Sequence, residues 1–163
     1  TLDVRGTRPD LDVAQSLQST FAAAGIRLDI APADGRQVLT KYRARNHGIF
    51  FGRWGPDYQD PHSNAQAFAS NPDNSDGALV KTLAWRNGWD IPELTKMTEA
   101  AILEPDREKR AGLYRAMQAR VQADSPFVIL FQEVEITVER AALAGFVVGP
   151  SFDTVFYRGV RKD

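Results

Sequence analysis

Residues 48–54 read GIFFGRW, and this short, mostly apolar run decides how the first third of the chain is interpreted. A brief apolar run bounded by turn-forming residues is typical of a strand buried inside a sheet. We therefore predict a strand here, with Ile49, Phe50 and Phe51 at its centre.

Before that strand, segments with the pattern of a strand alternate with segments that have the spacing of a helix. Residues 2–5 predict a first short strand, and the helix after it is expected to end at Gly25, a typical C-cap residue. Apolar and polar residues alternate over 26–30, as in a half-buried strand. Residues 32–35 read PADG, which predicts a turn, and residues 36–45 have helical spacing. The order strand, helix, strand, helix, strand indicates an α/β layer with parallel strands.

The chain changes character after the predicted buried strand. Residues 55–78 are rich in Pro, Gly, Asn and Asp, which predicts a long loop with at most one short helix, over 64–69. Two amphipathic helices are expected next, one over 91–102 and one that begins at Asp106 as N-cap. Residues 127–138 predict one long strand, buried at first and then half exposed.

The composition excludes several classes of protein. The net charge is −1, from 20 basic and 21 acidic residues, so no cationic field attracts nucleic acid. The basic stretches 41–45 and 158–162 are short, and we interpret them as a solvated helix face and a chain end. The absence of cysteine excludes disulfides, thiolate zinc sites and cysteine nucleophiles. No apolar run is long enough to span a bilayer, and residues 1–15 do not resemble a signal peptide.

Catalytic and metal-binding patterns are sparse. The histidines are His47 and His62, and neither stands in a G-x-S-x-G or H-E-x-x-H context. Asp57 and Asp60 could form a carboxylate pair for acid–base chemistry, and Asp60 with His62 could contribute to a metal site. Acidic residues in loops that contain proline more often cap turns. We therefore assign no catalytic residue, no metal ligand and no cofactor.

Residues 54–61 read WGPDYQDP and are the most informative segment. Taken alone, they are interpreted as the end of a strand, a turn and an aromatic residue that covers the edge of the sheet. This segment is one of five whose sequence patterns follow one another in the order known from one protein family. The five segments are residues 13–26, 51–61, 104–114, 125–132 and 138–146. Together they resemble the extracytoplasmic solute-binding proteins of ABC transporters for peptides, dipeptides and nickel complexes, known as solute-binding protein family 5.

The resemblance implies a fold and a domain organisation. Members of the family are much longer two-lobed proteins with a periplasmic-binding-protein-like fold of type II. Residues 1–131 would then be most of the second, C-terminal lobe, an α/β lobe with a mixed sheet flanked by helices. Residues 132–163 would be a tail that crosses the hinge towards the first lobe, which is missing from this sequence.

The resemblance also implies a ligand site. The aspartate at the position of Asp57 pairs with the α-ammonium group of a bound peptide, and Trp54 lies alongside, with Gly55 and Pro56 in the same loop. A buried ammonium group needs a carboxylate partner, and an indole face attracts cations. Arg8 stands where dipeptide binders use an arginine for the ligand carboxylate, which suits a guanidinium fork. Arg8 could equally be an ordinary surface arginine.

The function implied is therefore that of a non-enzymatic substrate-binding component of an ABC importer. It would capture a short peptide or an amino-acid-like solute in the periplasm, close about a hinge and deliver the solute to a membrane permease. We expect its signal peptide upstream of this fragment, and no nucleic-acid partner. The alternatives are another solute such as a sugar, an opine or a metal chelate, a hydrolase that uses Asp57 and Asp60, and a purely structural or interaction domain. The apolar tail would leave the fragment prone to self-association or to folding back on itself.

Overall fold

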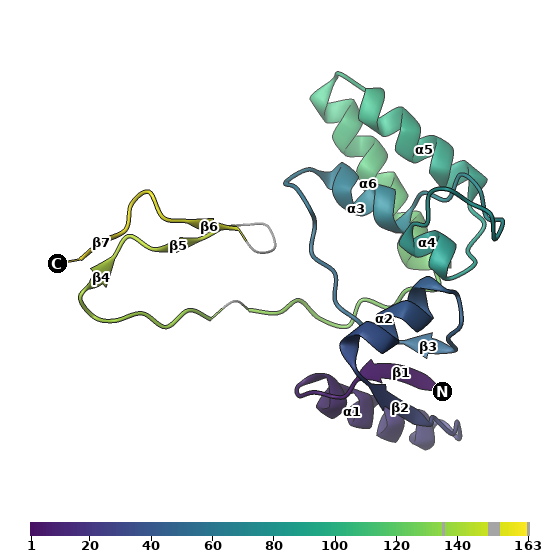
Figure 1. Cartoon of the computed structure of the whole chain (residues 1–163). Helices are drawn as coiled ribbons and strands as arrows, with labels where there is room; N and C mark the ends of the chain where they lie inside the picture. The colour runs from purple at the N-terminus through teal and green to yellow at the C-terminus, as the bar shows by residue number, and fades with distance from the viewer. Residues whose placement is uncertain (135, 150–153, 163) are drawn as a thin grey trace. The chain divides into compact units, whose positions relative to one another are not determined.

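The computed structural model describes residues 1–134, 136–149 and 154–162. The chain divides into two units (Figure 1). The first unit comprises Thr1–Trp54 and Asn71–Asp90. The second comprises Gly55–Ser70 and the described part of Ile91–Asp163.

A three-stranded sheet organises the first unit. The strands are β1 (Leu2–Arg5), β2 (Ile30–Ala33) and β3 (Ile49–Phe50), in the spatial order β2-β1-β3. Both neighbouring pairs of strands run parallel, as predicted. The helix α1 (Asp10–Ala23) connects β1 to β2, and the helix α2 (Gly35–Arg43) connects β2 to β3. The observed arrangement confirms an α/β architecture, and among the described residues no antiparallel strand joins this sheet.

The side chains of β1 alternate between the two connecting helices, as the period of a strand requires. Leu2 and Val4 are buried in a cluster with Ala14 of α1. Asp3 points the other way, and its carboxylate accepts a hydrogen bond of 2.6 Å from Lys41 of α2. The two helices therefore contact opposite faces of β1, as expected for two right-handed crossovers that run in opposite directions across the sheet, from β1 to β2 and from β2 to β3.

The helix α1 ends at Gly25, as predicted. Gly25 has φ +75°, a left-handed conformation that glycine adopts without a steric penalty. Its N–H donates to Ala22 O at 2.9 Å, and the N–H of Ile26 donates to Phe21 O at 2.9 Å. These two bonds form a Schellman motif and satisfy carbonyl groups that the helix end would otherwise leave free.

Two strand predictions need correction. The second strand begins at Ile30 rather than at Ile26, and it includes Pro32 and Ala33, which we had assigned to a turn. Pro32 is tolerated because β2 is an edge strand, where a missing N–H costs no ladder bond.

The third strand is shorter and less buried than predicted. It contains only Ile49 and Phe50, and Ile49 is 42% exposed. Among the described residues β3 pairs with β1 alone, so no strand lies along its other edge. Phe50 instead stacks on Tyr42 of α2, with ring centroids 3.9 Å apart.

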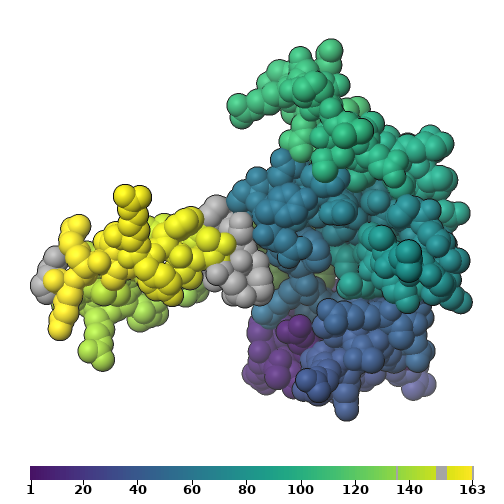
Figure 2. Space-filling view, turned by 45° about the horizontal axis from the view of Figure 1, so that its top comes forward, coloured from purple at the N-terminus to yellow at the C-terminus, as the bar shows by residue number. Residues whose placement is uncertain are grey.

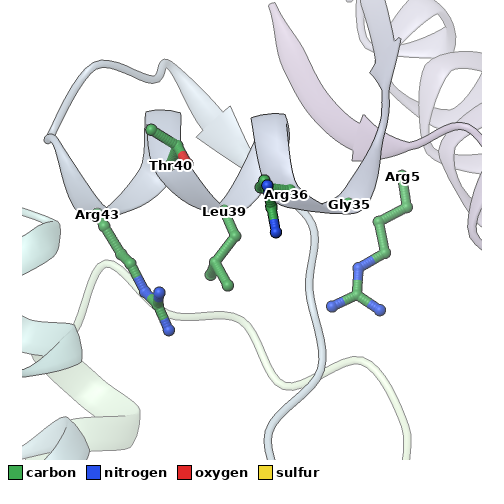
Figure 3. A pocket seen from close by; sticks show the side chains of 6 residues that line it. All are labelled: Arg5, Gly35, Arg36, Leu39, Thr40 and Arg43. Atoms are coloured by element: carbon green, nitrogen blue, oxygen red, sulfur yellow. The ribbon is translucent and has the colours of Figure 1, made fainter.

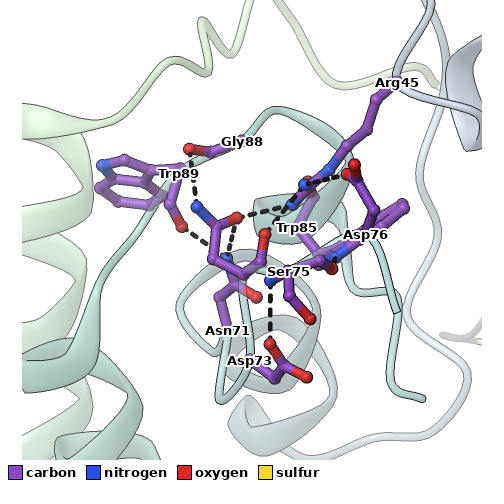
Figure 4. Close-up of polar contacts among 9 residues, drawn as sticks. Arg45, Asn71, Asp73, Ser75, Asp76, Trp85, Gly88 and Trp89 are labelled. Atoms are coloured by element: carbon purple, nitrogen blue, oxygen red, sulfur yellow. Dashed lines mark hydrogen bonds and ion pairs between the residues drawn. The ribbon is translucent and has the colours of Figure 1, made fainter. Parts of the chain in front are cut away.

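Several residues of the segment 71–90 contact Arg45 (Figure 4). The Arg45 side chain donates to Trp85 O, to Asn74 O at 3.0 Å and to Asn74 Oδ1 at 2.6 Å, and its guanidinium lies 3.7 Å from the centroid of the Trp85 ring. The short helix α4 (Leu83–Arg86) carries that tryptophan. Our interpretation of the basic stretch 41–45 as a solvated face is therefore wrong for Arg45, whose side chain is only 19% exposed.

Three helices form the body of the second unit, and they are α3 (Pro61–Phe68), α5 (Pro92–Leu103) and α6 (Arg107–Asp124). Asp106 caps α6 as predicted, because its carboxylate accepts from the N–H of Lys109 at 2.9 Å. Thr98 of α5 is buried and its hydroxyl donates to Leu94 O and Ala69 O, both at 3.0 Å. Ile102, which we had placed on the apolar face of that helix, is 50% exposed.

The predicted strand over 127–138 is wrong for the residues that the structure describes. Residues 127–134 and 136–138 have no strand and most of them are exposed, because no neighbouring strand offers them hydrogen bonds. Glu135 lies outside the described residues.

Short antiparallel ladders follow in the tail. They are β4 (Leu143–Ala144) with β7 (Arg161–Lys162), and β5 (Val147–Val148) with β6 (Val155–Phe156). The atoms of this segment are drawn in yellow-green and yellow in Figure 2. Phe152, an apolar residue of the tail, lies outside the described residues.

Candidate functional site

Arg8 and Trp54 follow the carboxyl ends of neighbouring strands. Arg8 comes three residues after the end of β1, and Trp54 comes four residues after the end of β3. In open α/β sheets, ligands bind outside the carboxyl ends of strands, at the point where the connections turn to opposite faces. The order β2-β1-β3 places such a point between β1 and β3.

The exposure of these two side chains differs. Trp54 is 43% exposed. The Arg8 side chain is 84% exposed and lies 3.6 Å from the carboxylate of Asp12, one turn along the chain. An exposed pair of this kind contributes little to stability, so Arg8 is held only weakly.

Gly55, Pro56 and Asp57 belong to the second unit. Asp57 is exposed, and its backbone N–H donates to the Ser63 hydroxyl of α3 at 3.1 Å. The loop that carries Asp57 is therefore tied to the first turn of a helix by its backbone.

Asp60 joins this loop to a distant helix. Its two carboxylate oxygens accept from the Arg110 guanidinium at 2.7 and 3.0 Å, a bidentate pair between the start of α3 and the first turn of α6. One of the same oxygens accepts from the backbone N–H of His62 at 2.8 Å and so caps α3. Two of the segments that carry the family resemblance, residues 51–61 and 104–114, therefore meet at this contact.

Tyr114 and His62 extend the network. The Tyr114 hydroxyl accepts from Arg110 at 3.2 Å and lies 3.3 Å from Nδ1 of His62. The hydrogen bond from Arg110 lowers the pKa of Asp60, and burial lowers the pKa of His62. Burial also raises the pKa of Tyr114, so the hydroxyl keeps its proton and can donate it to a neutral His62.

This arrangement limits the acid–base chemistry available to Asp57 and Asp60. A general acid needs a raised pKa, whereas the pKa of Asp60 is lowered by a partner that occupies both of its oxygens. His62 is buried against Tyr114, and the described residues contain no group of three His, Cys, Asp or Glu that could hold a metal ion. The geometry therefore gives no support to the hydrolase and metal-site alternatives.

Sequence reasoning did not identify Arg110, Tyr114 or Arg45 as organising residues. The signals were present for two of them, because Arg110 and Tyr114 stand in the segment 104–114 that carried part of the resemblance. The sequence did not reveal that Arg110 pairs with Asp60, because the two residues are fifty positions apart. Arg45 stood in a basic stretch with no visible partner at all.

Comparisons with known proteins identify relatives of the chain. The family model described as bacterial extracellular solute-binding proteins, family 5 Middle, matches residues 1–76. The peptide transport periplasmic protein SapA of Salmonella typhimurium is 22% identical over 153 residues, which cover 94% of this chain and 27% of that protein. Di/tripeptide-binding protein 4 of Pseudomonas aeruginosa is 27% identical over 155 residues, which cover 92% of this chain and 28% of that protein.

The chain thus spans about a quarter of the length of the curated relatives it matches. Among the described residues, no helix is long and apolar enough to cross a membrane. Over residues 1–76 the chain is similar to family 5 of the bacterial extracellular solute-binding proteins, and its curated relatives are peptide-binding or peptide-transport proteins.

Proposed function

We propose that this chain is most of the second lobe, with the hinge-crossing tail, of a type II solute-binding protein that serves an ABC importer. Residues 1–131 would form the lobe and residues 132–163 the tail that returns to a first lobe outside this sequence. The observation that carries the proposal is the place of Arg8 and Trp54 after the carboxyl ends of β1 and β3. The loop that follows Trp54 carries Asp57.

The proposed solute is a short peptide or an amino-acid-like molecule with a free amine. The exposed Asp57 carboxylate would pair with the ammonium group, and the Trp54 indole would contribute a cation–π contact. Gly55 and Pro56 would shape the loop between them, and Arg8 would receive a carboxylate. The names of the two relatives, which refer to peptide transport and di/tripeptide binding, support this class of solute.

The role is one of capture and delivery rather than catalysis. Both names describe binding or transport proteins, and Asp60 is already occupied by Arg110. We place the protein in the periplasm, where it would present the loaded, closed form to a membrane permease. A sugar, an opine or a metal chelate is the second candidate solute, and it would not depend on the charge of Asp57.

Calorimetry on the full-length protein that carries this chain tests the proposal. Asp57→Asn should weaken the binding of an amine-bearing dipeptide by about 1.5–3 kcal/mol, the usual contribution of a hydrogen bond to a charged group. Asp29→Asn is the matched control, because Asp29 is an exposed carboxylate whose partner is Arg27. Unchanged affinity in Asp57→Asn would remove this residue from the site, and absence of any dipeptide binding in the parent would turn attention to the second candidate.

A further inference from the structure

Three arginines line a hollow in the first unit (Figure 3). It has a volume of about 460 Å³ and is lined by Arg5, Gly35, Arg36, Leu39, Thr40 and Arg43. Arg5 ends β1, and the other residues belong to α2. Figure 3 shows the side chains of Arg36, Leu39 and Arg43 on the same side of α2, with Arg5 at one end of the row. No acidic residue lines the hollow.

The same three arginines differ from the other cationic side chains of the unit. Every other arginine and lysine there has an acidic or aromatic partner, and these residues are Arg8, Arg27, Lys41, Arg45, Arg53, Lys81 and Arg86. The guanidinium groups of Arg5, Arg36 and Arg43 form no hydrogen bond, ion pair or ring contact with any described residue. The unpaired guanidinium groups of this unit are thus the ones that line the hollow.

The positions of Arg5 and Arg36 are unfavourable in the absence of an anion. Arg36 lies in the first turn of α2, where the helix dipole is positive and where no acidic residue stands. Arg5 passes over the start of the same helix, since a Cβ on Gly35 would lie 3.4 Å from its Nε. Asp34 supplies one carboxylate nearby, and it caps the helix by accepting from the N–H of Arg36 at 2.9 Å.

Arg43 has a different environment. It lies in the last turn of α2, where a cation interacts favourably with the helix dipole. Seven residues separate it from Arg36, which is about two helical turns or roughly 10 Å along the axis. Arg43 therefore lies at the far end of the row from Arg5, and its guanidinium adds positive charge to the hollow (Figure 3).

We propose that this hollow is a binding site for a small oxyanion, either a phosphate or a carboxylate group. Arg5 and Arg36 would hold the anion beside Gly35 through guanidinium hydrogen bonds, a geometry that suits both kinds of oxyanion. The site does not depend on the identity of the transported solute.

Amide chemical shifts of the 163-residue chain test the proposal. Inorganic phosphate and succinate are titrated separately at constant ionic strength, which removes non-specific screening. The amides of Gly35 and Arg36 should shift with saturation for at least one of the two probes. Saturation with phosphate alone would assign a phosphate site, and saturation with succinate alone would assign a carboxylate site.

Two variants and a control complete the experiment. Arg5→Gln and Arg36→Gln should each weaken binding about tenfold or more, as loss of a charge-assisted hydrogen bond predicts. Arg27→Gln removes an exposed arginine that already pairs with Asp29, and it should change the affinity less than about twofold. Arg36 is exposed, so its variant is expected to keep the fold even if Arg5→Gln does not. Shifts that do not saturate with either probe, or equal losses in Arg27→Gln and Arg36→Gln, would overturn the proposal.

Discussion

Asp60 and Arg110 form a bidentate ion pair, with hydrogen bonds of 2.7 and 3.0 Å, although fifty residues separate them in sequence. The same carboxylate caps α3, and Arg110 also donates to Ala101 O at 3.1 Å. This contact therefore fixes the start of α3 to two other helices. Because the N–H of Asp57 is bonded to Ser63 in the first turn of α3, the proposed ligand loop depends on the same anchor.

Two substitutions of Asp60 should separate its role in the ion pair with Arg110 from its role as the N-cap of α3. Asp60→Asn keeps an oxygen that can cap α3 but loses the ion pair with Arg110, whereas Asp60→Ala loses both. We expect Asp60→Ala to be less stable than Asp60→Asn by about 1 kcal/mol, the usual contribution of an N-cap. Urea denaturation of the two variants measures this difference, and equal stabilities would show that the cap contributes nothing.

Stability should fall on acidification in two steps. Burial lowers the pKa of His62 below its usual 6.5, so the unfolded chain binds a proton more readily. The stability that depends on neutral His62 is therefore complete above about pH 6.5 and declines as the pH falls below that value. The pKa of Asp60 is lowered from 3.8 by Arg110, so its contribution is lost only at still lower pH. Chemical denaturation at a series of pH values records both steps.

A histidine variant identifies the first step. Protonation would place a donor at Nδ1, facing a Tyr114 hydroxyl that already accepts from Arg110, beside a second positive charge. His62→Gln should therefore flatten the dependence of stability on pH between about 6.5 and 5. A curve that keeps its slope in this variant would assign the first step to another group.

Among the cationic residues of the first unit, Arg45 should be the one whose substitution lowers the free energy of unfolding most. Arg45→Lys loses the planar fork that reaches Trp85 O and both oxygens of Asn74, and we expect a loss of roughly 2 kcal/mol in the free energy of unfolding. Arg43→Ala is the control, because Arg43 is exposed and unpaired and should change stability by less than about 0.5 kcal/mol. Thermal denaturation that ranks the two variants equally would contradict the role of Arg45.

The exposed apolar tail predicts self-association of the isolated chain. The segment 127–138 carries large exposed side chains, and they are Val128, Ile129, Leu130, Phe131, Val134, Ile136 and Val138. Monomers rarely expose so much apolar surface, so we expect a symmetric dimer at micromolar concentration by light scattering. A monomer whose tail resists proteolysis would favour a tail folded on its own lobe instead.

Local patterns predicted the parts of the fold that local interactions determine. The end of α1 at Gly25 and the cap of α6 at Asp106 depend on neighbouring residues, and both predictions are confirmed. The strand over 127–138 failed because a strand depends on a partner, which no local pattern supplies. The same reason hid the contact between Asp60 and Arg110. Whether Arg8 and Asp57 bind a ligand stays a prediction, since it rests on the family resemblance and on the ends of two strands.

Pro32 disfavours the pairing of a further strand at one edge of the sheet. It stands in β2 opposite Val4, and as an edge residue without an N–H it cannot donate a hydrogen bond to a strand arriving from outside. Natural proteins use proline in this way to discourage unwanted pairing between molecules. The opposite border, at β3, carries no such block within Ile49–Phe50. Any strand that completes this sheet, from the same polypeptide or from another, is therefore expected to add beside β3.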